Sequence, residues 1–229
     1  MQQIASGVYQ IRSISNAYIV DGDSGVVLVD TGMPKRHGAV LGALGEIGRK
    51  PEQVTAIAIT HAHADHSGNA AILSRETDAP VVASSLDAPA LRGEVEYPSP
   101  PFLDGLPFLL PLYRRMSRVE SVEIDNIVEE GRTPALPPDM QVIATPGHTP
   151  GHISFLLDRD GGILLVGDAA VATKKGRARR GWMNRSTSTF DASICHIAEY
   201  DFELAYFAHS RPLRGGASQA FRQLAASIR

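Results

Sequence analysis

The pattern of apolar and polar positions predicts a chain that alternates short strands with amphipathic helices. Apolar runs rich in β-branched residues end at Gly, Pro, Asp or Asn, as buried strands do. Other apolar residues recur at helical spacing, and this alternation favours the α/β class. The predicted strands cover 4–11, 17–20, 26–30, 54–59, 81–83, 122–129, 140–144, 153–157, 163–166 and 202–207, the first three as a meander, and the predicted helices cover 36–48, 68–76, 190–200 and 217–228.

Composition and charge narrow the class of protein. The 229 residues are 43% hydrophobic and 21% charged, with a net charge of -3, as in an ordinary globular protein without general attraction to nucleic acid or anionic membranes. No apolar run is long enough to span a bilayer, and the first residues lack a signal-peptide pattern. The single cysteine, Cys195, predicts a buried thiol rather than a nucleophile, and we expect a cytoplasmic protein.

The candidate chemistry follows the strand predicted over 54–59. His61, His63, Asp65 and His66 lie within six residues where that strand turns toward a helix. Imidazole with carboxylate suits zinc, iron or manganese, and the alternation of His61 and His63 points both rings to one side of an extended chain. Asp65 and His66 then reach a second position beside the first. A polar turn that is merely rich in histidine is the alternative.

The HAHADH stretch resembles the HxHxDH signature of the metallo-β-lactamase superfamily. Further landmarks follow the family order along nearly the whole chain: VDTG at 29–32, TPGHTPGH at 145–152, GD at 167–168 and AHS at 208–210. The resemblance implies one domain over 1–229 with the α/β fold of this family, a four-layer αββα sandwich. It also implies an enzyme.

The resemblance assigns seven ligands to two zinc ions. His61, His63 and His148 would bind the first ion. Asp65, His66 and His209 would bind the second, and Asp168 would bridge the two. Two cations that share a water lower its pKa, so the family chemistry is a metal-bridging hydroxide that attacks an ester, thioester or lactone carbonyl. Asp65 would also help to move a proton to the leaving group.

We also make predictions for three residues outside this ligand set. The matching aspartate of the family supports the metal site, which is one role for Asp30, and capping the following turn is the other. His152 matches no ligand, and we expect it to pack behind the site. Ser210 follows His209 where the family commonly has glycine, so the loop geometry at the second ion is open to change.

Competing functions remain within the superfamily. Asp168 separates lactonases, glyoxalase II and phosphodiesterases from the zinc β-lactamases. Persulfide dioxygenases are a different class, oxidoreductases with one iron held by residues matching His61, His148 and Asp168. A phosphodiesterase or nuclease is supported by the six basic residues of 174–185, although a solvated loop is the simpler interpretation. We expect a small-molecule substrate rather than nucleic acid.

The segment 93–118 interrupts the alternation. It holds five prolines and a cluster of apolar residues that includes Phe102, Leu103, Phe108 and Leu112. The prolines argue against a continuous helix, and the length argues for a functional loop. In proteins that this chain resembles, such an insertion shapes the substrate pocket. An exposed apolar patch equally predicts a homodimer contact.

Overall fold

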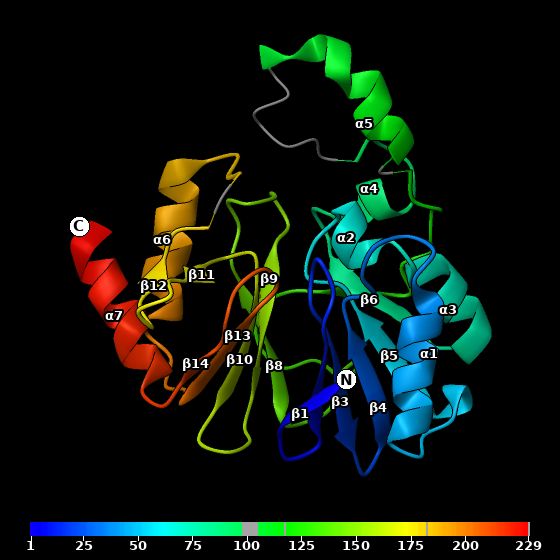
Figure 1. Cartoon of the computed structure of the whole chain (residues 1–229), viewed down its shortest axis with the longest axis horizontal. Coiled ribbons are helices and arrows are strands. Elements are labelled where there is room, and N and C mark those ends of the chain that lie inside the picture. Colours follow the sequence, from blue (N-terminus) through cyan, green and yellow to red (C-terminus); the bar gives the residue numbers. More distant parts are fainter. Residues whose placement is uncertain (98–104, 117, 182, 229) are drawn as a thin grey trace. The chain divides into compact units, whose positions relative to one another are not determined.

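Two sheets carry the core of the protein, one in each half of the chain. The structure is a computed structural model that describes residues 1–228 except 98–104, 117 and 182. These residues form two compact units, Met1–Val128 and Glu129–Arg229 (Figure 1). In the described part of the chain, no helix combines the length and the apolar character that a bilayer crossing requires.

The first unit contains a seven-stranded sheet whose strands follow the order of the chain. Strands β1 to β4 form the predicted antiparallel meander, and β4, β5, β6 and β7 then pair in parallel. The single strand predicted over 4–11 is wrong, because Gly7 with φ +63° turns the chain and splits it into a hairpin. The strands are β1 (Gln2–Ala5), β2 (Val8–Ile11), β3 (Ala17–Gly22), β4 (Gly25–Val29), β5 (Val54–Ala58), β6 (Val81–Ser84) and β7 (Asn126–Val128).

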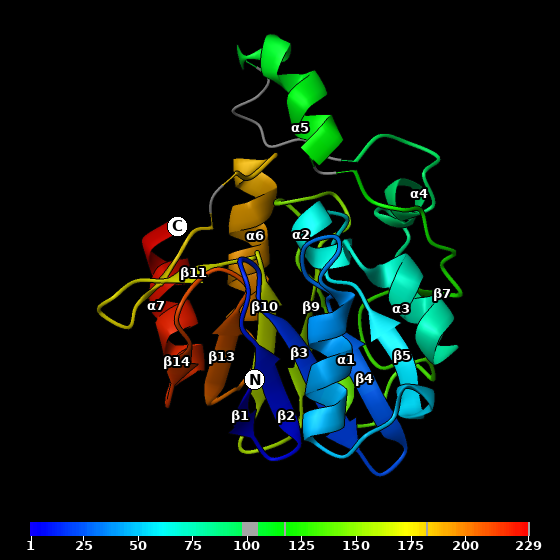
Figure 2. The same ribbon diagram turned by 45° about the vertical axis from the view of Figure 1, so that its right-hand side comes forward.

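Helices α1 and α3 of the first unit pack on this sheet (Figures 1 and 2). Val40 and Leu44 of α1 and Leu73 of α3 are buried against strand residues such as Leu28 and Ile57. The helix predicted over 68–76 is observed two residues later as Ala70–Thr77, and a separate short turn of helix, Ala64–Ser67, precedes it and carries Asp65 and His66. The helices are α1 (His37–Glu46), η1 (Pro51–Gln53), α2 (Ala64–Ser67), α3 (Ala70–Thr77), α4 (Ala88–Leu91), η3 (Pro107–Leu109) and α5 (Leu110–Met116).

The proline-rich segment is more helical than the sequence predicts. Pro111 is the second residue of α5, where its missing N–H costs no hydrogen bond, so the helix forms in spite of it. Phe108 is 74% exposed and Leu112 57% exposed, so the described part of the predicted apolar patch faces solvent. Phe102 and Leu103 lie outside the described residues.

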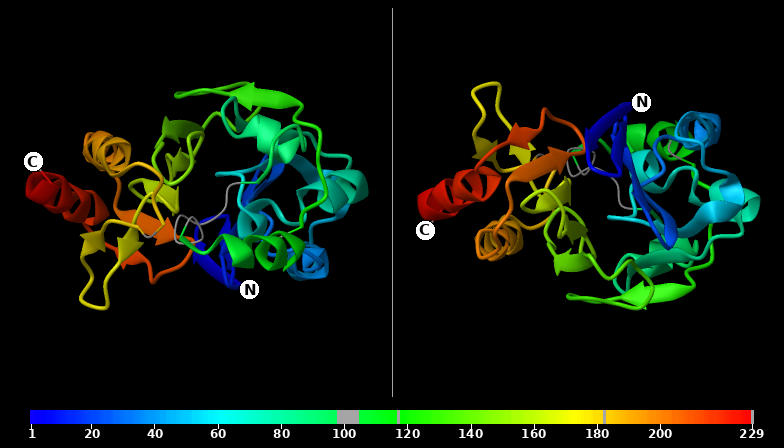
Figure 3. Two further views of the ribbon diagram at one scale, coloured as in Figure 1. Left: turned by 90° about the horizontal axis from the view of Figure 1, so that it is seen from above. Right: turned by 90° about the horizontal axis from the view of Figure 1, so that it is seen from below.

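The second unit contains a five-stranded sheet in the order β14-β13-β10-β9-β8. Only β10 and β13 pair in parallel among its described neighbours. Helices α6 and α7 lie side by side (Figure 3) and bury Phe190, Ile194 and Phe221 with strand residues such as Phe207. The elements are β8 (Met140–Ala144), β9 (Ile153–Leu157), β10 (Ile163–Gly167), β11 (Val171–Ala172), β12 (Ala178–Arg179), α6 (Thr187–Ile197), β13 (Leu204–Phe207), β14 (Leu213–Arg214) and α7 (Ala217–Ile228).

The basic segment 174–185 begins in a hairpin that the sequence did not predict. Strands β11 and β12 pair antiparallel, and Lys174, Lys175 and Arg177 at the turn are exposed. Arg180 makes two 2.6 Å hydrogen bonds to Asp191 at the start of α6. Part of the charge is therefore balanced locally, as a solvated loop requires.

Candidate metal-binding residues

Parallel strands gather the polar residues of the first unit at one edge of its sheet. Asp30 follows β4, Thr60 and His61 follow β5, and Asp87 follows β6. Because β4, β5 and β6 are parallel, their carboxyl ends lie at the same edge, where α/β proteins commonly place their sites. Asp30 takes φ +59°, a left-handed conformation that Asp tolerates better than most residues. The side chains that follow these three strands therefore lie close together at this edge.

Asp30 fixes the ring of His66. Its Oδ2 lies 2.7 Å from His66 Nδ1, and both side chains are buried. A carboxylate only accepts, so Nδ1 carries the proton and Nε2 presents its lone pair. Ser15 Oγ lies 3.0 Å from that Nε2 and donates to it. Carboxylate–histidine pairs of this kind orient metal ligands, and the arrangement agrees with the supporting role expected of Asp30.

Thr60 orients His61 in the same way. Its backbone N–H donates to Asp30 Oδ1 at 2.8 Å, and its hydroxyl donates to Asp30 Oδ2 at 2.8 Å. The hydroxyl oxygen can then only accept from His61 Nδ1, 3.0 Å away, which directs the His61 Nε2 lone pair outward. That Nε2 lies 2.9 Å from His63 Nδ1. The two ring nitrogens therefore lie close together on one side of the chain, as the alternation of the two histidines predicts.

Asp65 lies next to His66 on α2. One of its carboxylate oxygens is 3.7 Å from His66 Nε2, and its side chain is 25% exposed. Ser67 Oγ closes this short helix by donating to the His63 carbonyl at 3.0 Å, and it lies 3.4 Å from the Tyr97 hydroxyl. Burial raises the pKa of Tyr97, more than the Ser67 contact lowers it, so the phenol stays protonated at neutral pH.

Asp87 is a buried carboxylate that the sequence analysis did not find. Its Oδ2 accepts the Ala62 backbone N–H at 2.8 Å, between the two histidines of the HAH stretch. The side chain is buried at the edge where β6 ends. The residue belongs to no motif, but it follows a predicted strand by a few positions, which is the signal that could have identified it.

The second unit gathers three more of the predicted ligands. Parallel β10 and β13 deliver Asp168 and His209 to one edge of the sheet, and His148 lies in the loop between β8 and β9. Asp168 Oδ2 is 3.3 Å from His148 Nε2 and 3.4 Å from His209 Nε2. A tetrahedral ion with ligands at about 2.0–2.1 Å spaces them roughly 3.3 Å apart. The donor types and their spacing therefore fit metal ligands.

His152 lies behind Asp168, as the sequence predicts. Its Nε2 accepts the Asp168 backbone N–H at 2.9 Å, so Nδ1 carries the proton and donates to Thr145 Oγ1 at 2.8 Å. Thr145 Oγ1 lies 3.1 Å from Ser154 Oγ, which donates to the Val166 carbonyl. A buried chain of hydrogen bonds thus holds the backbone at Asp168.

The loop that carries His148 is held by close backbone packing. Gly147 takes φ +130°, and a Cβ there would lie 2.6 Å from the Phe190 backbone of α6. Its carbonyl accepts the Arg185 N–H at 2.8 Å, and Ser193 Oγ donates to the Pro146 carbonyl at 2.7 Å. Only glycine fits at position 147, so the loop has a defined path to His148.

Ser210, the departure from the family pattern, has a structural partner. Its Oγ accepts the Ala172 N–H of β11 at 2.8 Å. The serine after His209 therefore connects the His209 loop to the strand that leaves Asp168. This bond accounts for a hydroxyl where the family commonly has glycine.

Comparisons with known proteins agree with these motifs. Residues 11–218 match the model of the family described as "Metallo-beta-lactamase superfamily". "Probable metallo-hydrolase YflN" of Bacillus subtilis (strain 168) is 32% identical over 93% of this chain and 87% of its own length. An N-acyl homoserine lactonase of a Bacillus species is 28% identical over 67% of this chain, and the match spans 62% of the lactonase.

The solved structures agree on the fold. A metallo-beta-lactamase family protein of Thermus thermophilus gives a TM-score of 0.73 at 24% identity, over 97% of this chain and 79% of that one. A likeness at this identity concerns the fold alone. The predicted α/β fold of the metallo-β-lactamase type is confirmed.

Proposed function

Because the chain belongs to the metallo-beta-lactamase superfamily and is a metal-dependent hydrolase, we propose that it is a dinuclear zinc enzyme for an ester, thioester or lactone. Kinship with proteins named N-acyl homoserine lactonase supports the lactone among these substrates. Asp168 supports the same branch, since the zinc β-lactamases do not use an aspartate at the matching place. A small molecule rather than nucleic acid is the proposed substrate.

The proposed ligands are the seven residues predicted from the sequence. His61 and His63 would hold one zinc ion together with His148. Asp65 and His66 would hold the second together with His209, and Asp168 would bridge the ions. Support comes from two pairs of ligand atoms in the first unit, 2.9 Å apart for His61 and His63 and 3.7 Å apart for Asp65 and His66.

One observation carries the dinuclear proposal. A single oxygen, Asp168 Oδ2, lies 3.3 Å from His148 Nε2 and 3.4 Å from His209 Nε2. Each histidine belongs to a different ion in the proposed ligand set. An oxygen at ligand spacing from both histidines is what a bridging carboxylate requires.

The remaining residues do the work of orientation and proton transfer. Bound zinc would supply a nucleophilic water at neutral pH and polarise the substrate carbonyl. Asp30 and Thr60 keep the Nε2 lone pairs of His66 and His61 turned outward. Asp65 is partly exposed, so its carboxylate can reach a leaving alkoxide or thiolate and return a proton to it.

Three further features belong to the same proposal. The two units would work as one domain over 1–229, with 93–118 as an insertion. The exposed Phe108 and Leu112 of that insertion support a homodimer contact. The single cysteine, which excludes an internal disulfide, supports a cytoplasmic enzyme.

The test combines metal content with activity. The protein is purified without added metal or chelator, and elemental mass spectrometry gives the ions per chain before a panel of lactones, thioesters and phosphodiesters is assayed. We expect two zinc per chain and carbonyl-ester hydrolysis. We expect D168N to lose zinc, while D191N, which only changes the pair with Arg180, keeps it. About one iron per chain would favour the oxidoreductase instead, and zinc retained by D168N would refute the bridge.

A further inference from the structure

We propose that a groove between the loop after β2 and helix α1 holds the apolar acyl chain of the substrate, a proposal that rests on the proposed hydrolase function. The groove has a volume of about 470 Å³ and lies wholly in the first unit. Its apolar walls come from the β2–β3 loop, the β4–α1 loop and α1, and they include Ile11, Ile14, Met33, Ala39 and Val40. We call it the acyl groove.

The inner end of the acyl groove adjoins the proposed metal ligands. Ser15 and Thr31 line the groove, and each is bonded to His66. Ser15 Oγ lies 3.0 Å from His66 Nε2, and Thr31 Oγ1 donates to the His66 carbonyl at 2.9 Å. A carbonyl that reacts beside His66 would therefore have its acyl chain directed into this groove.

One wall of the groove is held rigidly by Asn69. Its Nδ2 donates to the Thr31 carbonyl at 2.6 Å and to the Met33 carbonyl at 2.8 Å, and its Oδ1 accepts the Arg36 N–H at 3.0 Å. The loop after β4 is thus fixed before any ligand arrives. A preformed wall of this kind is typical of ligand pockets.

The opposite lip of the groove carries an unusual exposed residue. Ile14 is 71% exposed, although it lies among residues that line the cavity. An apolar side chain in this position loses contact with water when an alkyl chain enters the groove. Each methylene that is buried this way raises affinity about fourfold.

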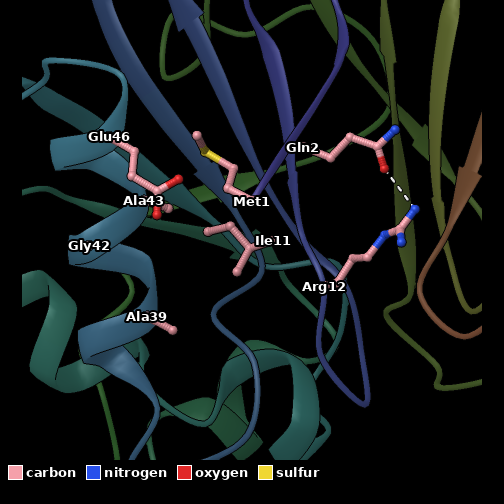
Figure 4. A pocket seen from close by; sticks show the side chains of 8 residues that line it. All are labelled: Met1, Gln2, Ile11, Arg12, Ala39, Gly42, Ala43 and Glu46. Atoms are coloured by element: carbon pink, nitrogen blue, oxygen red, sulfur yellow. Dashed lines mark hydrogen bonds between the residues drawn. The ribbon is translucent and has the colours of Figure 1, made fainter.

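A second cavity, whose lining residues are drawn in Figure 4, continues the acyl groove along α1. It has a volume of about 600 Å³ and shares Ile11, Arg12 and Ala39 with the acyl groove. Gly42 leaves the α1 side of this cavity without a side chain, and a Cβ at this position would have no atom within 4 Å. From Ala39 to Glu46 the helix provides about 10 Å of length at 1.5 Å per residue.

The charges along the cavity favour an uncharged chain. The Arg12 guanidinium donates to the Gln2 amide oxygen at 2.7 Å (Figure 4). Glu46 lines the outer cavity, where its carboxylate would repel a second carboxylate on the ligand. Arg12 and Arg36 also line the acyl groove, but Arg12 is already bonded to Gln2, and Glu46 stands in the outer cavity, so the proposed occupant is an acyl chain without a terminal anion.

The test uses three leucine substitutions on one helix. A39L fills the part that the two cavities share, G42L fills only the outer cavity, and G45L adds the same side chain at an exposed position that lines neither. Hydrolysis of N-acyl homoserine lactones and p-nitrophenyl esters with butanoyl to dodecanoyl chains is measured as kcat/KM on the zinc-loaded full chain.

We expect wild type and G45L to prefer longer chains by up to about fourfold per methylene. A39L should lose that preference from medium chains onward, and G42L only for the longest chains. A chain-length profile of A39L equal to that of G45L would overturn the acyl groove while leaving the hydrolase intact.

A binding measurement separates this inference from the proposed function. Octanamide carries the chain without a scissile ester, and its binding is followed by ligand-observed NMR. Binding to wild type and G45L but not to A39L would support the groove even if every ester were inert. Equal binding to all three variants, or binding to none, would contradict it.

Discussion

The buried contacts of Asp30 give a prediction that separates stability from metal affinity. In wild type, one carboxylate accepts from the Thr60 backbone at 2.8 Å, from the Thr60 hydroxyl at 2.8 Å and from His66 Nδ1 at 2.7 Å. D30N keeps the positive φ, which Asn tolerates, and keeps one oxygen for the Thr60 N–H. Its NH₂ group would face the Thr60 hydroxyl and His66 Nδ1–H, which are both donors. The charged contact with His66 is therefore lost.

The expected loss of unfolding free energy follows from the one hydrogen bond that D30N removes. Loss of one hydrogen bond to a charged, buried group costs about 1.5–3 kcal/mol of unfolding free energy. The His66 ring would no longer be held in the tautomer that presents Nε2, and removing such a partner lowers metal affinity about 10- to 100-fold. Because these hydrogen bonds join protein groups only, the loss of stability should appear in chelator-treated protein.

Two assays measure the two effects. Urea unfolding of chelator-treated D30N gives the change in unfolding free energy, and competition with a zinc chelator gives the affinity. D191N is the control, since its pair with Arg180 is at the surface, where solvent screens the charges and an ion pair contributes little to stability. An unfolding free energy of D30N within about 0.5 kcal/mol of that of D191N would refute the reasoning, because a buried charged bond cannot be lost at so small a cost.

Three other substitutions, with G45A as a control for G147A, test the packing around the candidate metal-binding residues and the proposed dimer contact. D87A leaves the buried Ala62 N–H without its acceptor, so urea unfolding should show a loss of about 1–3 kcal/mol. G147A should lower the melting temperature and disturb α6, since its Cβ meets backbone at 2.6 Å, whereas G45A in the open face of α1 should raise stability by about 0.5–1 kcal/mol. F108E should convert a dimer to a monomer in light scattering, and a wild-type monomer would contradict the contact proposed there.

Much of the fold follows from local pattern. The strands over Met140–Ala144 and Ile153–Leu157 and the helix over Ala217–Ile228 have the predicted ends, because their apolar periodicity stops at clear breakers. The hairpin at Gly7 was missed because its turn, Ser6–Gly7, interrupts the apolar pattern too briefly to show. Helix α5 was missed for a different reason, since proline is a breaker in a helix interior but not in a first turn.

The polar residues of the candidate site were predictable from the sequence only where a motif marked them. His61, His63, Asp65 and His66 are adjacent in sequence, so chemistry could be inferred from spacing. Asp87 stands alone among apolar and small residues, and its role depends on a hydrogen bond to Ala62, 25 positions away. Tertiary contacts of this kind leave no local pattern.

The direction of the strands determines where these polar residues gather. In the first unit β2 runs the same way as β4, β5 and β6, because two antiparallel pairings separate β2 from β4. The residues that follow these four strands are Ser15, Asp30, His61 and Asp87. In the second unit β8, β10 and β13 run in one direction by the same reasoning, and His148, Asp168 and His209 follow them.

The rule identifies residues by position as well as by type. Strands that run in one direction end at one edge of their sheet, so a polar residue just beyond each end must lie among the others, whatever motif it belongs to. Ser15 and Asp87 meet this condition without resembling any signature, and both contact the HAHADH segment, at His66 and Ala62. The positions of these residues are therefore specified by where co-directional strands end, and the family motif marks only those proposed to bind metal.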